Sequence, residues 1–465
     1  MPATDDIAAR FAQACAYMER GHVNEARQAY LDLLAKAPDH VGALNNLGTL
    51  LFDTGYRSAA RTAYTQAVTT HPEDPVGHVN LGNLLLAEGL NDEARTHFER
   101  ALRAAPDHPE AHRGLAYCFT LIGDEAEARK HRDTAFTGHA IVQLPFRGEG
   151  KPISALVLVG ARGGNVPTRF LLDNRIFAVT VAIADYLGAD QPLPDHQIVF
   201  NTVGDADLDV EALLAAQKIV ARTQAPVVNR PERIVGTGRA DTARRLGAIP
   251  GLRTPRVDRL LLEKATETEF AKRGFTVPFL IRAPGFHTGH HFHRIERIDQ
   301  LGPALAGMPG PYVMAIEALD ARGAGGLWRK YRAMMIDGRL YPLHLAIATQ
   351  WKVHYFSAAM AEYPSHRAEE AAFLADMPHA LGARAVAALE QINETLGLDY
   401  GGIDFGLNAA GEVLLFEANA TMVVNPPEPD PRWDYRRAPV QSVLDAVRTM
   451  LLERVGNFAA RTAES

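Results

Sequence analysis

A repeat of 34 residues runs through the first part of this 465-residue chain. The positions that share this spacing are Gly21, Gly55, Gly89 and Gly123, Ala26, Ala60, Ala94 and Ala128, Tyr30, Tyr64 and Phe98, and Pro38, Pro72 and Pro106. A repeat of this length is one supersecondary unit, which buries its apolar face only by stacking on its neighbours. The period therefore constrains this region to a stacked array of similar units.

The residue types in the repeat predict a pair of helices in each unit. Gly48 follows a leucine and leaves room for the paired helix to approach closely. Seven residues later, Gly55 suits the turn between the helices, because glycine adopts positive φ readily. A proline follows the second helix, which it cannot continue. Residues 6–136 resemble the tetratricopeptide repeat, and we predict an all-α solenoid over residues 1–136.

A solenoid of this kind offers a concave surface, and two uses of it stay open. The array binds a peptide or protein partner, or it only packs on the following domain or supports a homodimer. It carries 13 Lys and Arg against 19 Asp and Glu, whereas the rest of the chain is close to neutral. This acidity favours a basic partner.

Composition argues against several classes of protein. No apolar stretch approaches the ~20 residues that cross a bilayer, and the acidic amino terminus lacks the segments of a signal peptide. Basic residues form no cluster that would predict a nucleic-acid interface. Cys15 and Cys118 lie within helical patterns. We expect both to be small buried apolar side chains and not part of a disulfide framework. We therefore expect a cytoplasmic protein that binds neither membrane nor nucleic acid.

Strands alternate with helices after a predicted linker at residues 137–151. An apolar run at residues 153–160 ends in glycine, and a strand within residues 196–208 runs into an acidic loop. An amphipathic helix is predicted over residues 208–223. This alternation predicts an α/β unit over residues 152–236.

A polar hairpin near the carboxyl terminus is the sharpest local signal. Residues 398–422 read LDYGGIDFGLNAAGEVLLFEANATM, two strands joined by an Ala-Ala-Gly turn. Alternation along antiparallel strands predicts that Asp404, Glu417 and Asn419 share one face. Three oxygen ligands there suit Mg²⁺ that bridges nucleotide phosphates. An ordinary solvent-facing hairpin is the alternative, although a plain strand would not place a carboxylate directly after an apolar run.

The spacing Asp-x12-Glu-x-Asn is similar to the metal-binding end of ATP-grasp enzymes such as D-alanine–D-alanine ligase and glutathione synthetase. The resemblance covers about residues 152–456 and is strongest over residues 275–425. It implies an α+β multidomain chain. The expected parts are the solenoid, an α/β pre-ATP-grasp unit over residues 152–236, an ATP-grasp nucleotide-binding and catalytic module over residues 237–456, and a tail over residues 457–465.

Further segments resemble the family elements that hold the nucleotide. Residues 275–295 are similar to the flexible loop and flanking strands over the phosphates, and residues 311–320 to the hinge strand beside adenine. Residues 328–347 resemble the following strand pair, and residues 237–246 a helix start. Arginine stands at position 282, where the family usually has lysine. The residues implied in nucleotide binding are Arg239, Arg282, Gly285, His287, Gly289, Glu317, Asp320 and Lys330.

The resemblance implies a carboxylate–amine ligase that uses Mg·ATP. A substrate carboxylate attacks the γ-phosphate, and an amine then displaces phosphate from the acyl phosphate to form an amide. Arg282, Lys330 and Arg332 offset charge during transfer. A peptide or protein docked by the repeats is the substrate that we favour. The alternatives are a small-molecule kinase of the same fold and a non-catalytic scaffold that binds nucleotide.

A histidine cluster leaves a second metal site open. It consists of His287, His290, His291 and His293. Structural zinc sites more often use cysteine or separated histidine pairs. The histidines lie in the loop expected over the phosphates, and this position favours contacts to phosphate or substrate.

Overall fold

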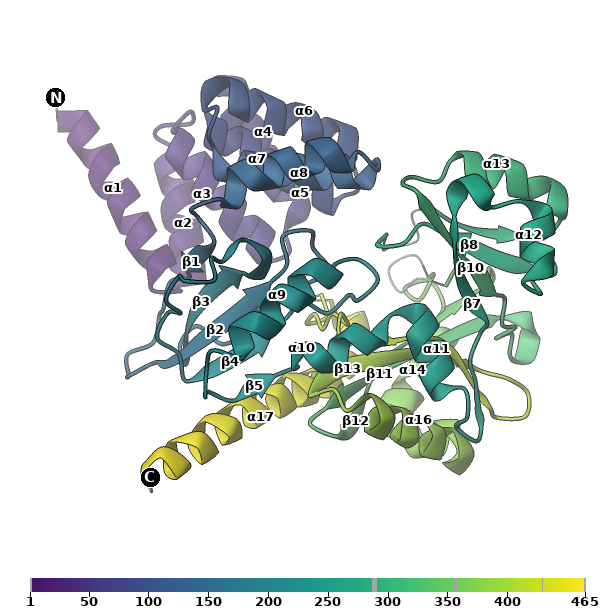
Figure 1. Ribbon diagram of the computed structural model, residues 1–465. Coiled ribbons are helices and arrows are strands. Elements are labelled where there is room, and N and C mark those ends of the chain that lie inside the picture. Colours follow the sequence, from purple (N-terminus) through teal and green to yellow (C-terminus); the bar gives the residue numbers. More distant parts are fainter. Residues whose placement is uncertain (1, 287–290, 354–357, 429, 464–465) are drawn as a thin grey trace. The chain divides into compact units, whose positions relative to one another are not determined.

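The region with the 34-residue period and the region with the α/β pattern form two units in the computed structural model. The structure describes residues 2–286, 291–353, 358–428 and 430–463. The repeat unit comprises Met1–His139 and Arg147–Glu149, and the α/β unit comprises Ala140–Phe146 and Gly150–Ser465. Figure 1 labels the main helices and strands of both units. Among the helices of the described ranges, none is long and apolar enough to cross a bilayer.

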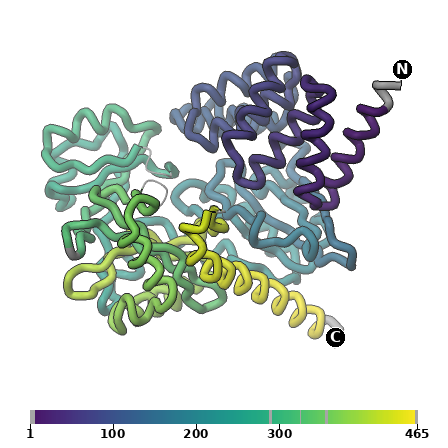
Figure 2. Tube along the Cα trace, turned by 180° about the vertical axis from the view of Figure 1, so that it is seen from behind, coloured from purple at the N-terminus to yellow at the C-terminus, as the bar shows by residue number. Residues whose placement is uncertain are grey.

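The repeat unit consists of helices that pair in sequence, as the purple-to-blue tube in Figure 2 shows. Their bounds are α1 (Pro2–Glu19), α2 (Val23–Leu34), α3 (Val41–Asp53), α4 (Arg57–Thr70), α5 (Pro75–Ala87), α6 (Asn91–Ala104), α7 (Pro109–Leu121) and α8 (Glu125–Phe136). Each odd-numbered helix packs on the next helix, and each such hairpin packs on the following one. The predicted all-α solenoid is confirmed.

Aromatic rings of the second helices fill the space that glycines leave in the first helices. A Cβ added at Gly48 would lie 2.4 Å from the ring of Tyr64, and one at Gly82 would lie 2.7 Å from the ring of Phe98. Gly55 adopts a φ of +88° in the turn between α3 and α4. The close approach and the turn predicted from the repeat are therefore both present.

A mostly parallel five-stranded sheet begins the α/β unit, in the order β1-β3-β2-β4-β5. Its elements are β1 (Ile141–Gln143), β2 (Ile153–Val159), β3 (Phe177–Ile183), η1 (Ala184–Tyr186), β4 (Ile198–Asn201), α9 (Val210–Val220), β5 (Val227–Val228), α10 (Pro231–Ile234), η2 (Val235–Thr237) and α11 (Arg239–Leu246). Leu156 and Leu158 pack toward α9, whereas Ala155 and Val157 pack toward α17 (Arg437–Ala463). Helices on both faces explain why β2 is a continuous apolar run.

The second sheet is antiparallel and has the order β7-β10-β8-β9. The elements of this region are β6 (Leu252–Arg253), β7 (Val257–Leu261), η3 (Leu262–Lys264), α12 (Glu267–Lys272), β8 (Phe279–Arg282), β9 (Phe292–Ile295), η4 (Ile298–Gln300), α13 (Leu301–Ala306) and β10 (Tyr312–Glu317). Phe270 of α12 packs on Phe279 of β8 with ring centroids 5.2 Å apart, which joins helix and sheet.

The third sheet has the order β12-β11-β13-β14-β6. Its region comprises η5 (Ala324–Gly326), β11 (Trp328–Ile336), β12 (Arg339–Ala348), α14 (Pro364–Ala375), α15 (Met377–Leu381), α16 (Ala383–Leu396), β13 (Tyr400–Leu407), β14 (Val413–Asn419), η6 (Pro431–Arg436) and α17. Along β11, Tyr331, Ala333 and Met335 pack in the core formed with α14 to α16. Alternation therefore turns Lys330 and Arg332 to the opposite face.

Two segments differ from the expected boundaries. Within the segment expected as a linker, Ile141–Gln143 forms β1, which pairs antiparallel with β3. This pairing satisfies backbone groups at the edge of the sheet. At the other end, α17 continues to Ala463, through most of the expected tail at residues 457–465.

Candidate functional site

A β-bulge in the hairpin of β13 and β14 places Asp404 and Glu417, the hairpin carboxylates, on one face of the sheet. In the antiparallel pair of β13 and β14, Phe405 lies opposite Leu415, and Asp404 lies opposite Glu417. Phe416 therefore has no cross-strand partner, and the bulge changes the alternation along β14. Without it, Glu417 would share the face of Leu415, which packs in the core with α16. The predicted shared face of Asp404 and Glu417 is present, but it depends on the bulge.

Asp404 is bound by two of the basic side chains of β11, Lys330 and Arg332. Arg332 donates to it through Nε at 2.6 Å and Nη2 at 2.9 Å, and Nζ of Lys330 lies 3.1 Å from Oδ2. The carboxylate is almost fully buried. Burial raises its pKa, but the charges of Arg332 and Lys330 outweigh burial and hold that pKa well below the usual range. Asp404 is therefore a permanent anion held by two cations.

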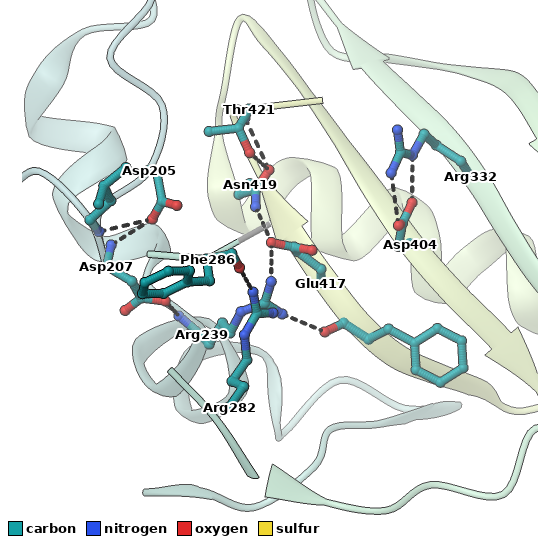
Figure 3. A network of polar contacts seen from close by, with 12 residues as sticks. Asp205, Asp207, Arg239, Arg282, Phe286, Arg332, Asp404, Glu417, Asn419 and Thr421 are labelled. Carbon is teal, nitrogen blue, oxygen red and sulfur yellow. Dashed lines mark hydrogen bonds and ion pairs between the residues drawn. The ribbon is translucent and has the colours of Figure 1, made fainter. Parts of the chain in front are cut away.

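Glu417 is bound from a different direction, as Figure 3 shows. Its Oε1 accepts from Nη2 of Arg239 at 2.5 Å and from Nδ2 of Asn419 at 2.7 Å. The Oδ1 of Asn419 accepts from the backbone N–H of Thr421 at 3.0 Å and from its hydroxyl at 2.9 Å. Asn419 thus directs its amide nitrogen toward Glu417 and its oxygen toward Thr421, so the three predicted oxygen ligands do not converge as expected.

Arg282 is a buried cation beside Arg239. Its guanidinium donates to the backbone carbonyl of Phe286 and lies 5.4 Å from the ring centroid of Phe292. Burial, together with the charge of Arg239, lowers the pKa of Arg282 to about 10. The side chain is nevertheless charged at neutral pH. The two guanidiniums thus lie beside the acidic side chains of Asp205, Asp207 and Glu417, whose charges act on Arg282 in the opposite direction.

A cavity of about 490 Å³ contains these charged groups. Its apolar wall includes Leu280, Ile316, Leu319, Trp328, Leu415 and Phe416. Its polar part includes Arg239, Arg282, Lys330, Arg332, Asp404 and Glu417. The lining comes from strands of both the second and the third sheet, so the two sheets together build a pocket with one apolar and one charged region.

The remaining predicted residues occupy different places. Glu317 lines the cavity, accepts from Arg253 at 2.7 Å and accepts from the backbone N–H of Arg256 at 3.1 Å. Asp320 pairs with Arg322 at the surface, so the structure does not bring it to the cavity.

Among the loop residues, Gly285 lines a smaller adjoining cavity of about 30 Å³. His287 and Gly289 lie outside the described residues, as does His290 of the histidine cluster.

Two acidic residues of the site were not predicted. Asp207 follows β4 and accepts from the backbone N–H of Arg239 at 2.9 Å, at the start of α11. Burial is the main cause that raises the pKa of Asp207. Asp205 accepts from the backbone N–H groups of Asp207 and Leu208. Both line the smaller cavity with Arg239 and Arg282. The acidic loop after a predicted strand was the signal that could have identified them.

The cavity offers carboxylates that could bind a metal ion and cations that could bind an anion. Carboxylates are the ligands that Mg²⁺ prefers, and Asp404 and Glu417 face the same cavity. The neighbouring guanidiniums and the ammonium of Lys330 match phosphate oxygens. In the described ranges, no group of three or more His, Cys, Asp or Glu side chains could hold a metal ion. A metal here would depend on two carboxylates and non-protein ligands or the amide of Asn419.

Comparison with known proteins identifies the repeat region. The family model of the tetratricopeptide repeat matches residues 11–75 and 79–133, which confirms that prediction for the array. A comparison with curated proteins gave no match. The ATP-grasp resemblance of the α/β unit stays a prediction.

Several solved structures are similar to parts of the chain. MamA from Desulfovibrio magneticus is 17% identical over 28% of this chain and 73% of its own, with a TM-score of 0.26. A tetratricopeptide repeat protein from Parabacteroides merdae is 20% identical over 28% of this chain and 52% of its own, with a TM-score of 0.26. A mutant O-GlcNAc transferase from Thermobaculum terrenum is 18% identical over 53% of this chain and 44% of its own, with a TM-score of 0.30.

Proposed function

We propose that the α/β unit binds a magnesium–ATP complex and acts as a carboxylate–amine ligase. One observation carries this proposal: a single cavity of about 490 Å³ joins an apolar wall to buried basic side chains and a pair of hairpin carboxylates. An apolar wall suits a nucleobase, and clustered guanidiniums suit a polyphosphate. The hairpin carboxylates suit the accompanying metal ion.

In this proposal each side chain has an electrostatic task. Arg282, Lys330 and Arg332 bind phosphate oxygens and offset the charge that develops on the transferred group. Asp404 and Glu417 hold the magnesium ion, which when bound polarises the phosphates and screens their charge. The apolar wall of the cavity limits the approach of water from that side, which would protect an acyl phosphate from hydrolysis before an amine arrives.

The repeat array supplies a second part of the proposal, because tetratricopeptide arrays offer an extended surface for protein interaction. We propose that it docks a peptide or protein that carries the carboxylate or the amine. Its excess of acidic residues over basic ones, 19 against 13 in residues 1–136, favours a basic segment.

Calorimetric titration of the full-length protein with ATP in the presence of MgCl₂ tests the nucleotide proposal. We expect saturable binding of one nucleotide per chain, and competition by ADP. A protein that is folded by circular dichroism but gives no binding heat, and no thermal stabilisation by Mg·ATP, would refute it.

The products separate the ligase from the alternative kinase. A ligase releases ADP and inorganic phosphate and joins its two substrates, whereas a kinase transfers the γ-phosphate to its substrate. Incubation with γ-labelled ATP and a library of basic peptides distinguishes label in free phosphate from label on a peptide.

A further inference from the structure

Basic and acidic side chains of the cavity form ion pairs with one another. Arg332 and Lys330 bind Asp404, and Arg239 binds Glu417. Two of the cations proposed to hold phosphate, Lys330 and Arg332, are therefore paired with a carboxylate proposed to hold the metal. These pairs must separate before either partner can bind a ligand.

Burial makes it costly to separate these pairs one at a time. The side chain of Asp404 is 5% exposed, and those of Lys330 and Arg332 are 16% and 19% exposed. Removing one partner of a buried ion pair leaves an uncompensated charge, which is strongly unfavourable. A metal ion that took Asp404 alone would leave two cations unpaired. A metal-free triphosphate that took the cations would leave carboxylates unpaired beside an anion.

We propose that nucleotide and Mg²⁺ bind this site as one complex through an exchange of ion pairs. Arg332, Lys330 and Arg239 transfer from the carboxylates to the phosphates, and the released Asp404 and Glu417 take the metal. This inference rests on the proposed binding of Mg·ATP. It adds that the site selects the metal complex over either ligand alone.

Arg282 differs from the other cations and gives the exchange a starting point. Among the described residues, its hydrogen-bonding partner is the neutral carbonyl of Phe286, and it forms no ion pair. A phosphate can therefore reach Arg282 without first breaking an ion pair. Its charge also repels Arg239, so an arriving anion stabilises both guanidiniums.

Equilibrium titration of the wild-type, full-length protein tests the coupling. ATP is titrated in EDTA and in excess MgCl₂, and MgCl₂ is titrated alone, with binding followed by calorimetry. We expect ATP to bind at least about 10-fold more tightly with Mg²⁺, within the range typical of coupled ligands. Equal ATP affinity in both conditions overturns this inference and leaves the proposed nucleotide site intact. No ATP binding in either condition refutes the proposed site itself.

Carboxylate variants test the exchange of ion pairs from the side of the protein. Asp404→Asn releases Arg332 and Lys330, so metal-free ATP should bind several-fold more tightly than to wild type, while the effect of Mg²⁺ shrinks. Metal-free ATP binding that stays unchanged in Asp404→Asn overturns the exchange.

Glu417→Gln releases Arg239 and repeats the test, in case Asp404→Asn does not fold. The control is Asp299→Asn, which breaks an exposed pair with Arg297 of 3.1 Å and should leave all affinities unchanged. If both cavity variants unfold, the wild-type comparison in EDTA and MgCl₂ decides.

Discussion

Asp404 and Glu417 face each other across β13 and β14, yet they are bound by cations from different parts of the chain. Asp404 receives the forked guanidinium of Arg332 from the neighbouring strand, whereas Glu417 receives Arg239 from the start of α11. The acidic hairpin thus forms ion pairs both with a strand of its own sheet, β11, and with the helix α11. A change at Asp404 and a change at Glu417 should therefore release different cations.

Glu417→Gln keeps the volume of the side chain but removes its negative charge. If Glu417 holds the metal, the release of phosphate from ATP should fall by at least about 100-fold, as when an electrostatic group of the transition state is lost. Colorimetric phosphate detection measures this. Glu412→Gln, which breaks an exposed pair with Arg384, is the control. Turnover of Glu417→Gln close to wild type would exclude the metal assignment.

Arg282→Ala should weaken Mg·ATP binding by at least about 10-fold, because a charge-assisted phosphate contact is lost. Arg282→Lys should retain most of the affinity, since an ammonium also binds phosphate, although without the planar fork. Arg297→Ala at the surface is the control for loss of an arginine. Calorimetry measures all three affinities. If both Arg282 variants fold and bind ATP like wild type, Arg282 does not contact the nucleotide.

A protein truncated to begin at residue 140 should retain Mg·ATP binding within about threefold of the full chain's affinity, because all the cavity residues lie in the α/β unit. A second truncation, beginning at residue 152, removes β1 and its pairing with β3. It should unfold at a lower temperature, since an edge of the sheet loses its partner. Thermal unfolding followed by circular dichroism compares the two. Equal unfolding temperatures would show that β1 contributes no stability.

Gly82→Ala should destabilise the repeat unit by about 1–3 kcal/mol, the usual cost of overpacking. The added Cβ would lie 2.7 Å from the ring of Phe98, which is fully buried. Gly456→Ala is the matched control, because this helical glycine has no atom within 4 Å of the added Cβ. It should be neutral or stabilise α17 by up to about 1 kcal/mol. Urea unfolding measures both, and equal midpoints would contradict the packing.

The repeat unit should lose stability as the pH falls from about 6.5 to about 4. The Nδ1 atoms of His78 and His97 lie 2.9 Å apart, and the pair recurs at His112 and His131, where they lie 2.7 Å apart. Burial, with the charge of His78, lowers the pKa of His97 from 6.5 to about 4. Between these values the unfolded chain binds more protons than the folded chain, so acid favours unfolding.

Thermal unfolding between pH 7.5 and pH 4.5 measures this dependence. The double variant His97→Gln and His131→Gln removes the two titrating groups whose pKa values are lowered. It should show a smaller change in unfolding temperature over the same range. An unfolding temperature that is equally pH-dependent in the variant would assign the effect to other groups.

The repeat array could be predicted from sequence because its packing is local. Gly48 meets Tyr64 of the same hairpin, and Gly55 forms the turn between those two helices. A period of 34 residues repeats these short-range contacts, so the sequence shows them directly. Similarly, the apolar run of β2 and the hairpin of β13 and β14 were recognisable, since each is a continuous segment.

The candidate site could be predicted only in part, because its geometry depends on distant segments. The bulge at Phe416 decides which face Glu417 occupies, and strict alternation along the strand gives no sign of it. Asp207 contacts the start of α11 only because the loop after β4 reaches that helix in the fold.

The sequence by itself therefore determined which charged groups are present and which strands carry them. Tertiary structure decided which of them pair. Asp404 binds Arg332, 72 residues away, and Glu417 binds Arg239, 178 residues away. Ion pairing depends on distance and burial in the folded chain, and neither quantity is encoded in the spacing of residues along the sequence.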